Sequence, residues 1–271
     1  MEMNKKKLLL ALVCIMVFSF FCYGVVKVYN KFTLLSEEVT VLSREVVSLN
    51  KEVAGQYEAY VMNNKSAIDT FPHHVLCLGN SITCHSPKED VGWYSDWGMA
   101  ASCIEKDYCH QLEKMLKAKN DKSTVTPLNI SNWESNLGCD IDSLIGKELQ
   151  DKDIVIIRLG ENVQDIDLFR SKIVELAKYC KLHTPNVVVT GCFWENADKE
   201  ECLIRAAYLN HLKYIPLFWI TRGHKDVAYP KPSDKITDLN CGTYTLTHDG
   251  VLKHPGDEGM KIIADCIYNC L

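Results

Sequence analysis

Three short, mostly apolar runs constrain the fold of this chain more than any other feature. They are Val75–Leu78, Asp153–Leu159 and Asn186–Gly191, and each is followed by turn-forming residues. A continuous apolar run bounded by turns is typical of a strand buried on both faces of a parallel sheet. Segments with the helical spacing of apolar residues alternate with these runs. The sequence therefore predicts βαβ units, with a parallel sheet covered by helices on both faces.

The other elements of this α/β domain follow from the same patterns. We expect two further strands, Val125–Ile130 and Tyr214–Ile220. The expected helices are Ala100–Lys119, Asp140–Leu149, Leu168–Leu182, Ala197–Lys213 and Asp257–Cys270. The segment between Thr221 and His248 is predicted to be irregular. No internal repeat interrupts the pattern, so residues 73–271 are predicted to form one domain.

The first residues have the composition of a membrane anchor. The lysine cluster Lys5–Lys7 precedes Leu8–Val26, nineteen residues without a charge, which is long enough to span a bilayer. A cleaved signal peptide is the alternative, but Phe20–Tyr23 offers no small-residue cleavage site. We expect a cytoplasmic tail at 1–7 and a transmembrane signal anchor at 8–27. Because lysines stay inside, the C-terminal domain of this single-pass membrane protein is expected outside the cytoplasm, periplasmic or extracellular.

Residues 28–57 predict a stalk. From Phe32 to Val53 the apolar residues are spaced alternately three and four apart, mostly valine at position a and leucine at position d. This heptad pattern favours a parallel two-stranded coiled coil. A single amphipathic helix lying against the globular domain is the alternative. We expect the coiled coil, a homodimer formed through it, and a polar linker at 58–72.

Charge and cysteine content narrow the classes of function. The net charge is -5 and the lysines are scattered, so nucleic acid is not an expected partner. The thirteen cysteines include no CxxC pair and no zinc-like spacing. Cys77 and Cys192 lie within strand-like runs, and we expect them to be small buried apolar residues.

Polar residues follow two of the expected strands at the same edge of the sheet, where ligands bind in open α/β folds. Ser81 follows the first run and Asn162 follows the Asp153–Leu159 run. Acyl transfer needs a nucleophile, a base, a group that orients the base, and donors for the oxyanion. Ser81 can serve as the nucleophile and Asn162 as an oxyanion donor. His254 and Asp249, from the last loop, can serve as the base and its orienting acid.

Each of these residues also has a purely structural interpretation. Ser81 and Asp249 can be ordinary turn residues, and His254 can be a helix-entry residue before Pro255. His248, Asp249 and His254 can be imagined around a metal ion, but no other ligand stands at a recognisable spacing. We therefore predict no metal site and no cofactor.

Three sequence blocks, in this order, resemble those of the SGNH (GDSL-type) hydrolase superfamily. They are Gly79-Asn80-Ser81, Gly160-Glu161-Asn162 and His254-Pro255, and the resemblance covers about residues 73–271. It implies a flavodoxin-like three-layer α/β/α sandwich with serine esterase or acyl-transfer activity. Ser81 would be the nucleophile and its backbone N–H an oxyanion donor. Asn162 would be a second donor and His254 the base.

The chain departs from the family pattern at three places. Asn80 stands where the family often has Asp, and the glycine of the family's second block is missing from Asn129–Glu134. The usual acid lies three residues before the histidine, where this chain has Val251, whereas Asp249 lies five residues before it. We expect Asp249 as the acid. A Ser–His dyad oriented by a backbone carbonyl is the alternative, since a triad loses less with its acid than with its serine or histidine.

Tryptophans flank the expected site in the sequence. An exposed tryptophan face can carry a sugar ring, whereas a buried one belongs to the core. We expect Trp97 and Trp133 to contact the substrate, which favours a carbohydrate ligand.

Together these features predict a membrane-anchored serine ester hydrolase that removes acyl groups, acetyl above all, from a carbohydrate or small ester. An O-acyltransferase that modifies a surface polysaccharide would use the same residues, because water or a sugar hydroxyl can intercept the acyl-enzyme. A non-catalytic glycan-binding module on a membrane stalk is the third hypothesis.

Overall fold

The computed structural model describes residues 73–271. The predicted cytoplasmic tail, membrane anchor, coiled-coil stalk and linker all lie outside the described residues. Within residues 73–271, none of the helices has the length and apolar character needed to cross a bilayer.

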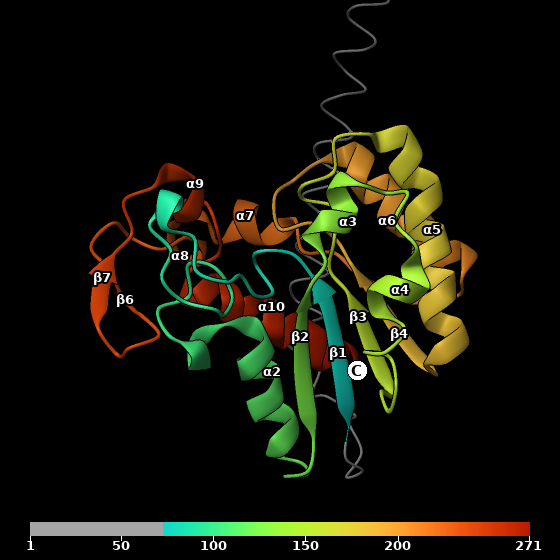
Figure 1. The fold of residues 1–271 in the computed structure, drawn as a ribbon, viewed down its shortest axis with the longest axis horizontal. Helices are drawn as coiled ribbons and strands as arrows, with labels where there is room; N and C mark the ends of the chain where they lie inside the picture. Colours follow the sequence, from blue (N-terminus) through green and yellow to red (C-terminus); the bar gives the residue numbers. More distant parts are fainter. Residues whose placement is uncertain (1–72) are drawn as a thin grey trace, which may run out of the picture. The chain divides into compact units, whose positions relative to one another are not determined.

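A five-stranded parallel sheet forms the centre of the domain (Figure 1). Its strands are β1 (His74–Gly79), β2 (Thr124–Asn129), β3 (Ile154–Ile157), β4 (Asn186–Thr190) and β5 (Lys213–Ile215). They pair in the order β2-β1-β3-β4-β5, the order of flavodoxin-like doubly wound sheets. Leu78 in β1 is in register with Leu128 in β2 and with Ile157 in β3. The prediction of a parallel sheet of about five strands is confirmed.

Helices cover both faces of this sheet. α5 (Ile166–His183) and α6 (Ala197–Leu209) pack together on one face, and α2 (Tyr108–Lys117) packs with α10 (Asp257–Cys270) on the other (Figure 1). Alternate residues of β1 point to opposite faces, and Val75–Leu78 are all fully buried. Both faces of the sheet are therefore core, which explains why its strands appear in the sequence as continuous apolar runs.

Short elements fill the connections. They are η1 (Glu89–Val91), η2 (Ile104–Lys106), α3 (Ser131–Ser135), α4 (Ile141–Ile145), α7 (Trp219–Gly223), α8 (Lys225–Ala228), β6 (Lys235–Thr237), β7 (Thr243–Thr245) and α9 (Asp249–Leu252). β6 and β7 pair antiparallel within the stretch that we predicted to be irregular. Cys77 and Cys192 are buried, as predicted.

Several predicted elements are shorter in the structure, and two of them are shorter for clear local reasons. The helix expected from Ala100 begins at Tyr108, because the Asp107 side chain caps it by accepting a hydrogen bond from the His110 N–H at 2.8 Å. The strand expected to reach Ile220 ends at Ile215, because Pro216 has no N–H to donate to a neighbouring strand.

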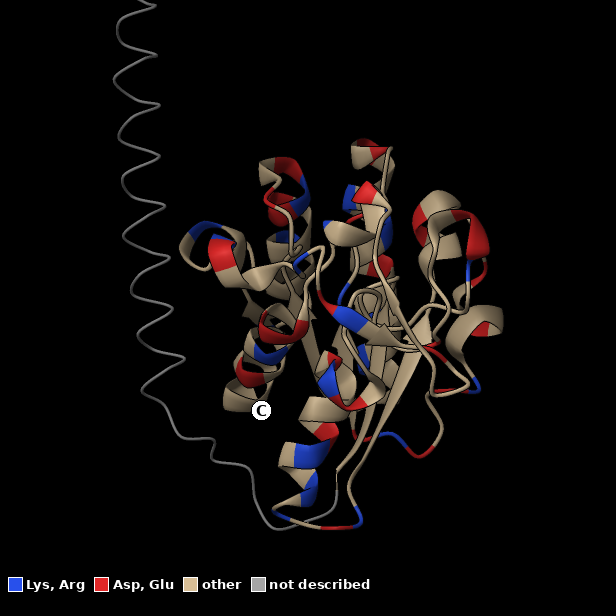
Figure 2. Cartoon of the chain, turned by 90° about the vertical axis from the view of Figure 1, so that its left-hand side faces the viewer, with Lys and Arg blue, Asp and Glu red and all other residues tan. Residues whose placement is uncertain are grey.

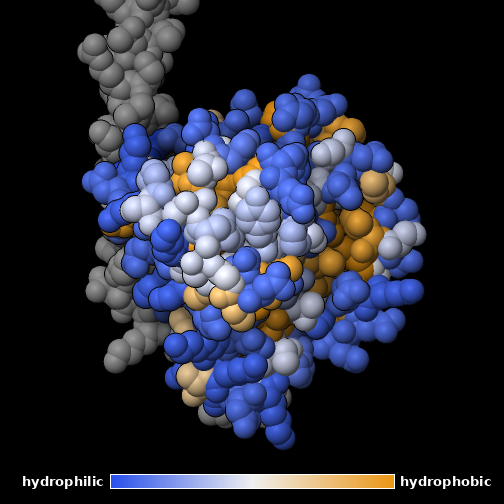
Figure 3. All heavy atoms as spheres, turned by 60° about the vertical axis from the view of Figure 1, so that its left-hand side comes forward, coloured by the Kyte–Doolittle hydropathy of each residue, from blue (hydrophilic) through white to orange (hydrophobic). Residues whose placement is uncertain are grey.

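The surface of the domain carries both signs of charge. In Figure 2, Lys and Arg are interspersed with Asp and Glu along the helices and loops. The face in Figure 3 is mostly hydrophilic, with hydrophobic residues gathered in separate small areas.

Candidate active site

The turn after β1 places Ser81 at the carboxyl edge of the sheet. β1 ends at Gly79, where an added Cβ would lie 1.8 Å from Thr83 Oγ1, so a residue with a side chain does not fit. The chain then closes tightly, because the Thr83 N–H donates to the Asn80 carbonyl at 2.8 Å. Only glycine allows this close approach two residues before the serine.

Ser81 and His254 are in direct contact. Ser81 Oγ lies 2.8 Å from His254 Nε2, and His254 Nδ1 lies 2.9 Å from the Gly250 carbonyl oxygen. A carbonyl oxygen only accepts, so Nδ1 must carry the proton and donate it. Nε2 is then the unprotonated nitrogen that accepts the hydrogen bond from the Ser81 hydroxyl. This is the arrangement that a general base requires.

The environment of His254 keeps its imidazole neutral. Burial, the main cause, lowers the pKa of His254 to about 4, and the charge of Arg158 acts in the same direction. The hydrogen bond to Gly250 opposes this shift. At neutral pH the ring is therefore able to take a proton from Ser81.

Asp249 does not orient His254 in the structure. It is exposed and is the first residue of α9, and the position beside Nδ1 is occupied by the Gly250 carbonyl. The His254 N–H also donates to the Val251 carbonyl at 2.9 Å. This hydrogen bond closes the chain after α9 into a turn, which brings the Gly250 carbonyl beside the ring. In the structure a backbone carbonyl thus stands where the Asp249 carboxylate was expected, which is the alternative arrangement that the sequence left open.

Asn162 and the Ser81 backbone are the two predicted oxyanion donors. Within residues 73–271 the Ser81 N–H has no hydrogen-bond partner. The exposed Asn162 follows Gly160, whose φ of 128° makes the turn after β3. One N–H of Asn162 Nδ2 donates to Glu134 Oε2 at 2.7 Å, which leaves its second N–H available to a ligand. Their role as oxyanion donors stays a prediction.

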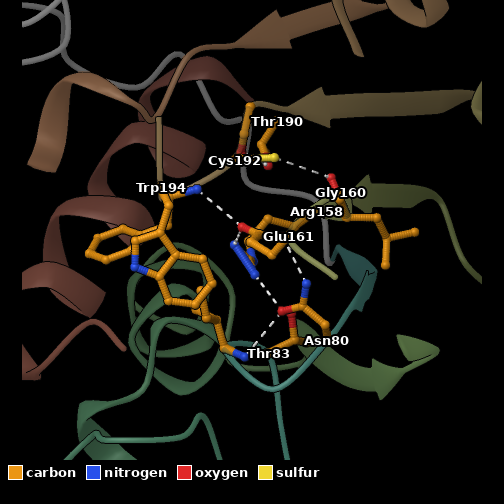
Figure 4. A network of polar contacts seen from close by, with 12 residues as sticks. Asn80, Thr83, Arg158, Gly160, Glu161, Thr190, Cys192 and Trp194 are labelled. Carbon is orange, nitrogen blue, oxygen red and sulfur yellow. Dashed lines mark hydrogen bonds and ion pairs between the residues drawn. The ribbon is translucent and has the colours of Figure 1, made fainter. Parts of the chain in front are cut away.

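A buried polar network joins Asn80, Arg158 and Glu161 (Figure 4). Arg158, which is fully buried, donates to Asn80 Oδ1 at 2.7 Å and to Glu161 Oε1 at 2.6 Å. Asn80 Nδ2 donates in turn to Glu161 Oε2 at 2.8 Å and toward the Glu134 carboxylate at 3.2 Å. Burial, followed by the charge of Glu161, raises the pKa of Glu134. The network joins Asn162 to the residue directly before Ser81.

The two tryptophans predicted to contact substrate belong to the core instead. Trp133 is fully buried and packs edge-on against Phe169, and Trp97 is 5% exposed and packs edge-on against Trp93. Neither presents a face to a sugar ring, because the fold places both under other side chains.

Trp194 is an aromatic residue that the sequence patterns did not single out. Its ring lies 5.4 Å from the His254 ring at a right angle, and its Nε1 donates to the Lys253 carbonyl at 3.0 Å. It follows β4 at the same edge of the sheet as Ser81 and Asn162, which is the signal that would have found it.

Comparisons with known proteins concern the fold. Neither a protein-family model nor a curated protein matches the sequence. Solved structures with a similar fold include LAE5, an α/β hydrolase from the metagenome of Lake Arreo, Spain, at 13% identity over 74% of this chain and 97% of that chain, with a TM-score of 0.48. A catalytic mutant of Axe2, an acetylxylan esterase from Geobacillus stearothermophilus, is 12% identical over 73% of this chain and 94% of that chain, with a TM-score of 0.48.

A two-domain esterase active on acetylated mannans is 17% identical over 72% of this chain and 48% of that chain, with a TM-score of 0.47. At these values the likeness is one of helix and strand arrangement, and the argument about chemistry depends on the geometry of Ser81 and His254.

Proposed function

We propose that residues 73–271 form a serine ester hydrolase in which Ser81 and His254 act as a catalytic dyad. One observation carries the proposal, namely the 2.8 Å contact of Ser81 Oγ with a His254 ring whose other nitrogen donates to Gly250. A serine that serves only as a turn residue has no need of an oriented, neutral imidazole. The same contact argues against the non-catalytic glycan-binding module.

The reaction follows from these groups. Ser81 Oγ attacks the ester carbonyl carbon while its proton passes to His254 Nε2, and the carbonyl electron pair moves onto the oxygen. The Ser81 N–H and the free N–H of Asn162 donate to this oxyanion. The alcohol then leaves with the proton from His254, and the acyl group stays on Ser81. Water repeats the sequence and releases the acid.

For the substrate we propose an acyl ester of a carbohydrate or a small alcohol, with acetyl as the acyl group. The half-buried Trp194 ring beside His254 supports this, since an aromatic wall next to the base suits the apolar face of such an alcohol. If an acylated glycan or sugar is the partner, its hydroxyl can also accept the acyl group from Ser81. Comparing the products formed with and without an added glycan separates hydrolysis from transfer.

Membrane attachment through residues 8–27 and dimerisation through residues 28–57 remain proposals drawn from the sequence. The uncharged run of nineteen residues and the heptad pattern support them. Membrane fractionation, protease accessibility of the C-terminal domain, and sedimentation of a soluble form with residues 28–57 test them. A soluble full-length protein, or a monomer at micromolar concentration, would contradict them.

Labelling with a fluorophosphonate probe, followed by mass spectrometry, tests the proposed function. We expect the label on Ser81, and we expect Ser81→Ala to lose the label and to slow p-nitrophenyl acetate hydrolysis by about 10³-fold or more. Ser86→Ala is the matched control, since it changes an exposed serine nearby. This variant should keep both the labelling by the probe and the rate of ester hydrolysis. A Ser81→Ala protein that hydrolyses the ester at the wild-type rate would refute the proposal.

A further inference from the structure

Among residues 73–271, Glu134 is the carboxylate that contacts both the turn after β3 and the Asn162 side chain. It lies in α3, is 2% exposed, and comes from a part of the chain distant from the other site residues. The sequence assigns it no role. A buried carboxylate is costly unless hydrogen bonds compensate for the lost water.

All hydrogen-bond partners of the Glu134 carboxylate donate to it. The Gly160 N–H approaches Oε1 at 2.5 Å, and Asn162 Nδ2 approaches Oε2 at 2.7 Å. Asn80 Nδ2 adds contacts at 3.3 and 3.2 Å, and the Asn162 N–H adds one at 3.4 Å. An ionised carboxylate is acceptor-only, and the side chain meets donors alone. Glu134 therefore fixes both the backbone of this turn and the direction of the Asn162 amide.

The direction of that amide decides whether Asn162 can serve an oxyanion. A rotation of the amide by 180° replaces the N–H donor with the carbonyl oxygen, which would repel a negative oxygen atom. The exposed Asn162 side chain has no hydrogen-bond partner other than Glu134 within residues 73–271. Because Glu134 accepts the hydrogen bonds of donors around it, it holds Nδ2 on the inner side and leaves the second N–H of the same nitrogen for the ligand.

The orientation of Glu134 is itself set by a series of hydrogen bonds in which the donor and the acceptor are fixed by the chemistry of the side chains. Arg158 has donors only, so the atom of Asn80 that it contacts must be Oδ1. Asn80 Nδ2 must then face the carboxylates of Glu134 and Glu161. This also explains why asparagine suits position 80, because an aspartate would place a third carboxylate against those of Glu134 and Glu161.

We propose that Glu134 is a positioning residue for catalysis, which holds the Asn162 amide with an N–H directed to the acyl oxygen and is itself oriented by Asn80 and Arg158. This inference rests on the proposed function, since it assigns Asn162 its oxyanion role. It deepens that function by naming the groups behind the oxyanion donor.

A double-mutant cycle between Glu134 and Asn162 tests the inference in the full-length protein. Glu134→Gln keeps the size of the side chain but places an amide among donors. We expect kcat for p-nitrophenyl acetate to fall about 10- to 100-fold with KM within twofold, since the lost donor serves the transition state. In the Asn162→Ala background the same change should cost less than about twofold, because Glu134 acts through Asn162.

Controls separate positioning from folding. Glu148→Gln removes an exposed carboxylate on another part of the surface and should leave kcat unchanged. If Glu134→Gln does not fold, Glu134→Asp keeps the charge and withdraws the carboxylate by one methylene. It should show the same fall in kcat alone and the same dependence on Asn162.

Equal losses with and without Asn162, or a change confined to KM, would overturn the role of Glu134. Either result would leave the proposed function intact as long as Ser81→Ala abolishes fluorophosphonate labelling. Labelling that survives in Ser81→Ala would instead overturn the proposed function, independently of Glu134.

Discussion

The two sides of the candidate site are held by different kinds of contact. The side of Asn162 depends on a buried side-chain network in which Arg158, Asn80 and Glu134 come from separate segments of the chain. The side of His254 depends on a main-chain carbonyl only four residues away. A substitution can remove each side chain of the network separately, whereas no substitution removes the backbone carbonyl of Gly250. The two sides should therefore respond very differently to substitution, and five experiments address that difference.

The largest effect is expected from the loss of the base itself. His254→Ala should reduce kcat by about 10³-fold or more, because it removes the ring nitrogen that accepts the Ser81 hydrogen bond. Steady-state hydrolysis of p-nitrophenyl acetate measures this change. His224→Ala, in the turn between α7 and α8, is a control expected to retain activity. Comparable losses in the two variants would indicate a general structural effect and not a catalytic one.

On the network side we expect a loss of stability. Arg158→Met leaves the Glu161 carboxylate buried without its cation, which should lower the free energy of unfolding by about 3–5 kcal/mol. Arg170→Met is the matched control, because Arg170 pairs with Glu201 at the surface and exposed pairs contribute only about 0–1 kcal/mol. Urea denaturation measures both. Equal destabilisation of the two variants would mean that the buried network does not stabilise the domain.

The pH dependence tests the environment of the base. With a pKa of about 4, His254 is roughly 90% neutral at pH 5, whereas at its ordinary value near 6.5 it would be only about 3% neutral. We expect kcat/KM to hold down to about pH 5 and to fall below it. An acid limb centred between pH 6 and 7 would contradict the predicted burial of the ring.

The lowered pKa of His254 also affects the stability of the fold. Between about pH 6.5 and pH 4 the unfolded chain binds a proton at His254 that the folded chain does not. This histidine therefore makes the free energy of unfolding decrease as the pH falls through that range. His254→Ala should reduce that pH dependence, which denaturation at several pH values can measure.

The smallest effect is expected at Asp249. Asp249→Asn should change kcat and KM by less than about twofold, because the Gly250 carbonyl already occupies the position beside His254 Nδ1. A tenfold loss of kcat in this variant would show that the carboxylate reaches the base during turnover. The dyad would then have to be replaced by a triad.

The sequence predicted those parts of the molecule that local patterns decide. The apolar run of β1 and the glycine at its end are local features, and the structure has a buried strand that ends at Gly79, where the chain approaches Thr83 closely. The parallel order of the strands follows from the alternation of strands and helices. The contact of Ser81 with His254 was expected because both belong to short recognisable blocks near strand and helix ends.

What the sequence did not predict depends on contacts between distant segments. The burial of Trp133 depends on Phe169, and the role inferred for Glu134 depends on Asn80 and Asn162. None of these pairings has a spacing that a pattern could detect. The position of Asp249 depends on the path of one short helix, α9. In this helix the Gly250 carbonyl, and not the Asp249 carboxylate, accepts the hydrogen bond from the imidazole.

The carbonyl of Gly250 has a consequence for how sites of this kind are recognised. Every amino acid carries the same backbone oxygen atom at this position. A substitution can therefore displace this hydrogen-bond acceptor only by changing the path of the backbone. A search for an aspartate three residues before the histidine meets Val251 here and would pass over the chain. Ser–His pairs without a carboxylate are therefore better identified by the atoms that contact the imidazole than by the residues that precede the histidine in the sequence.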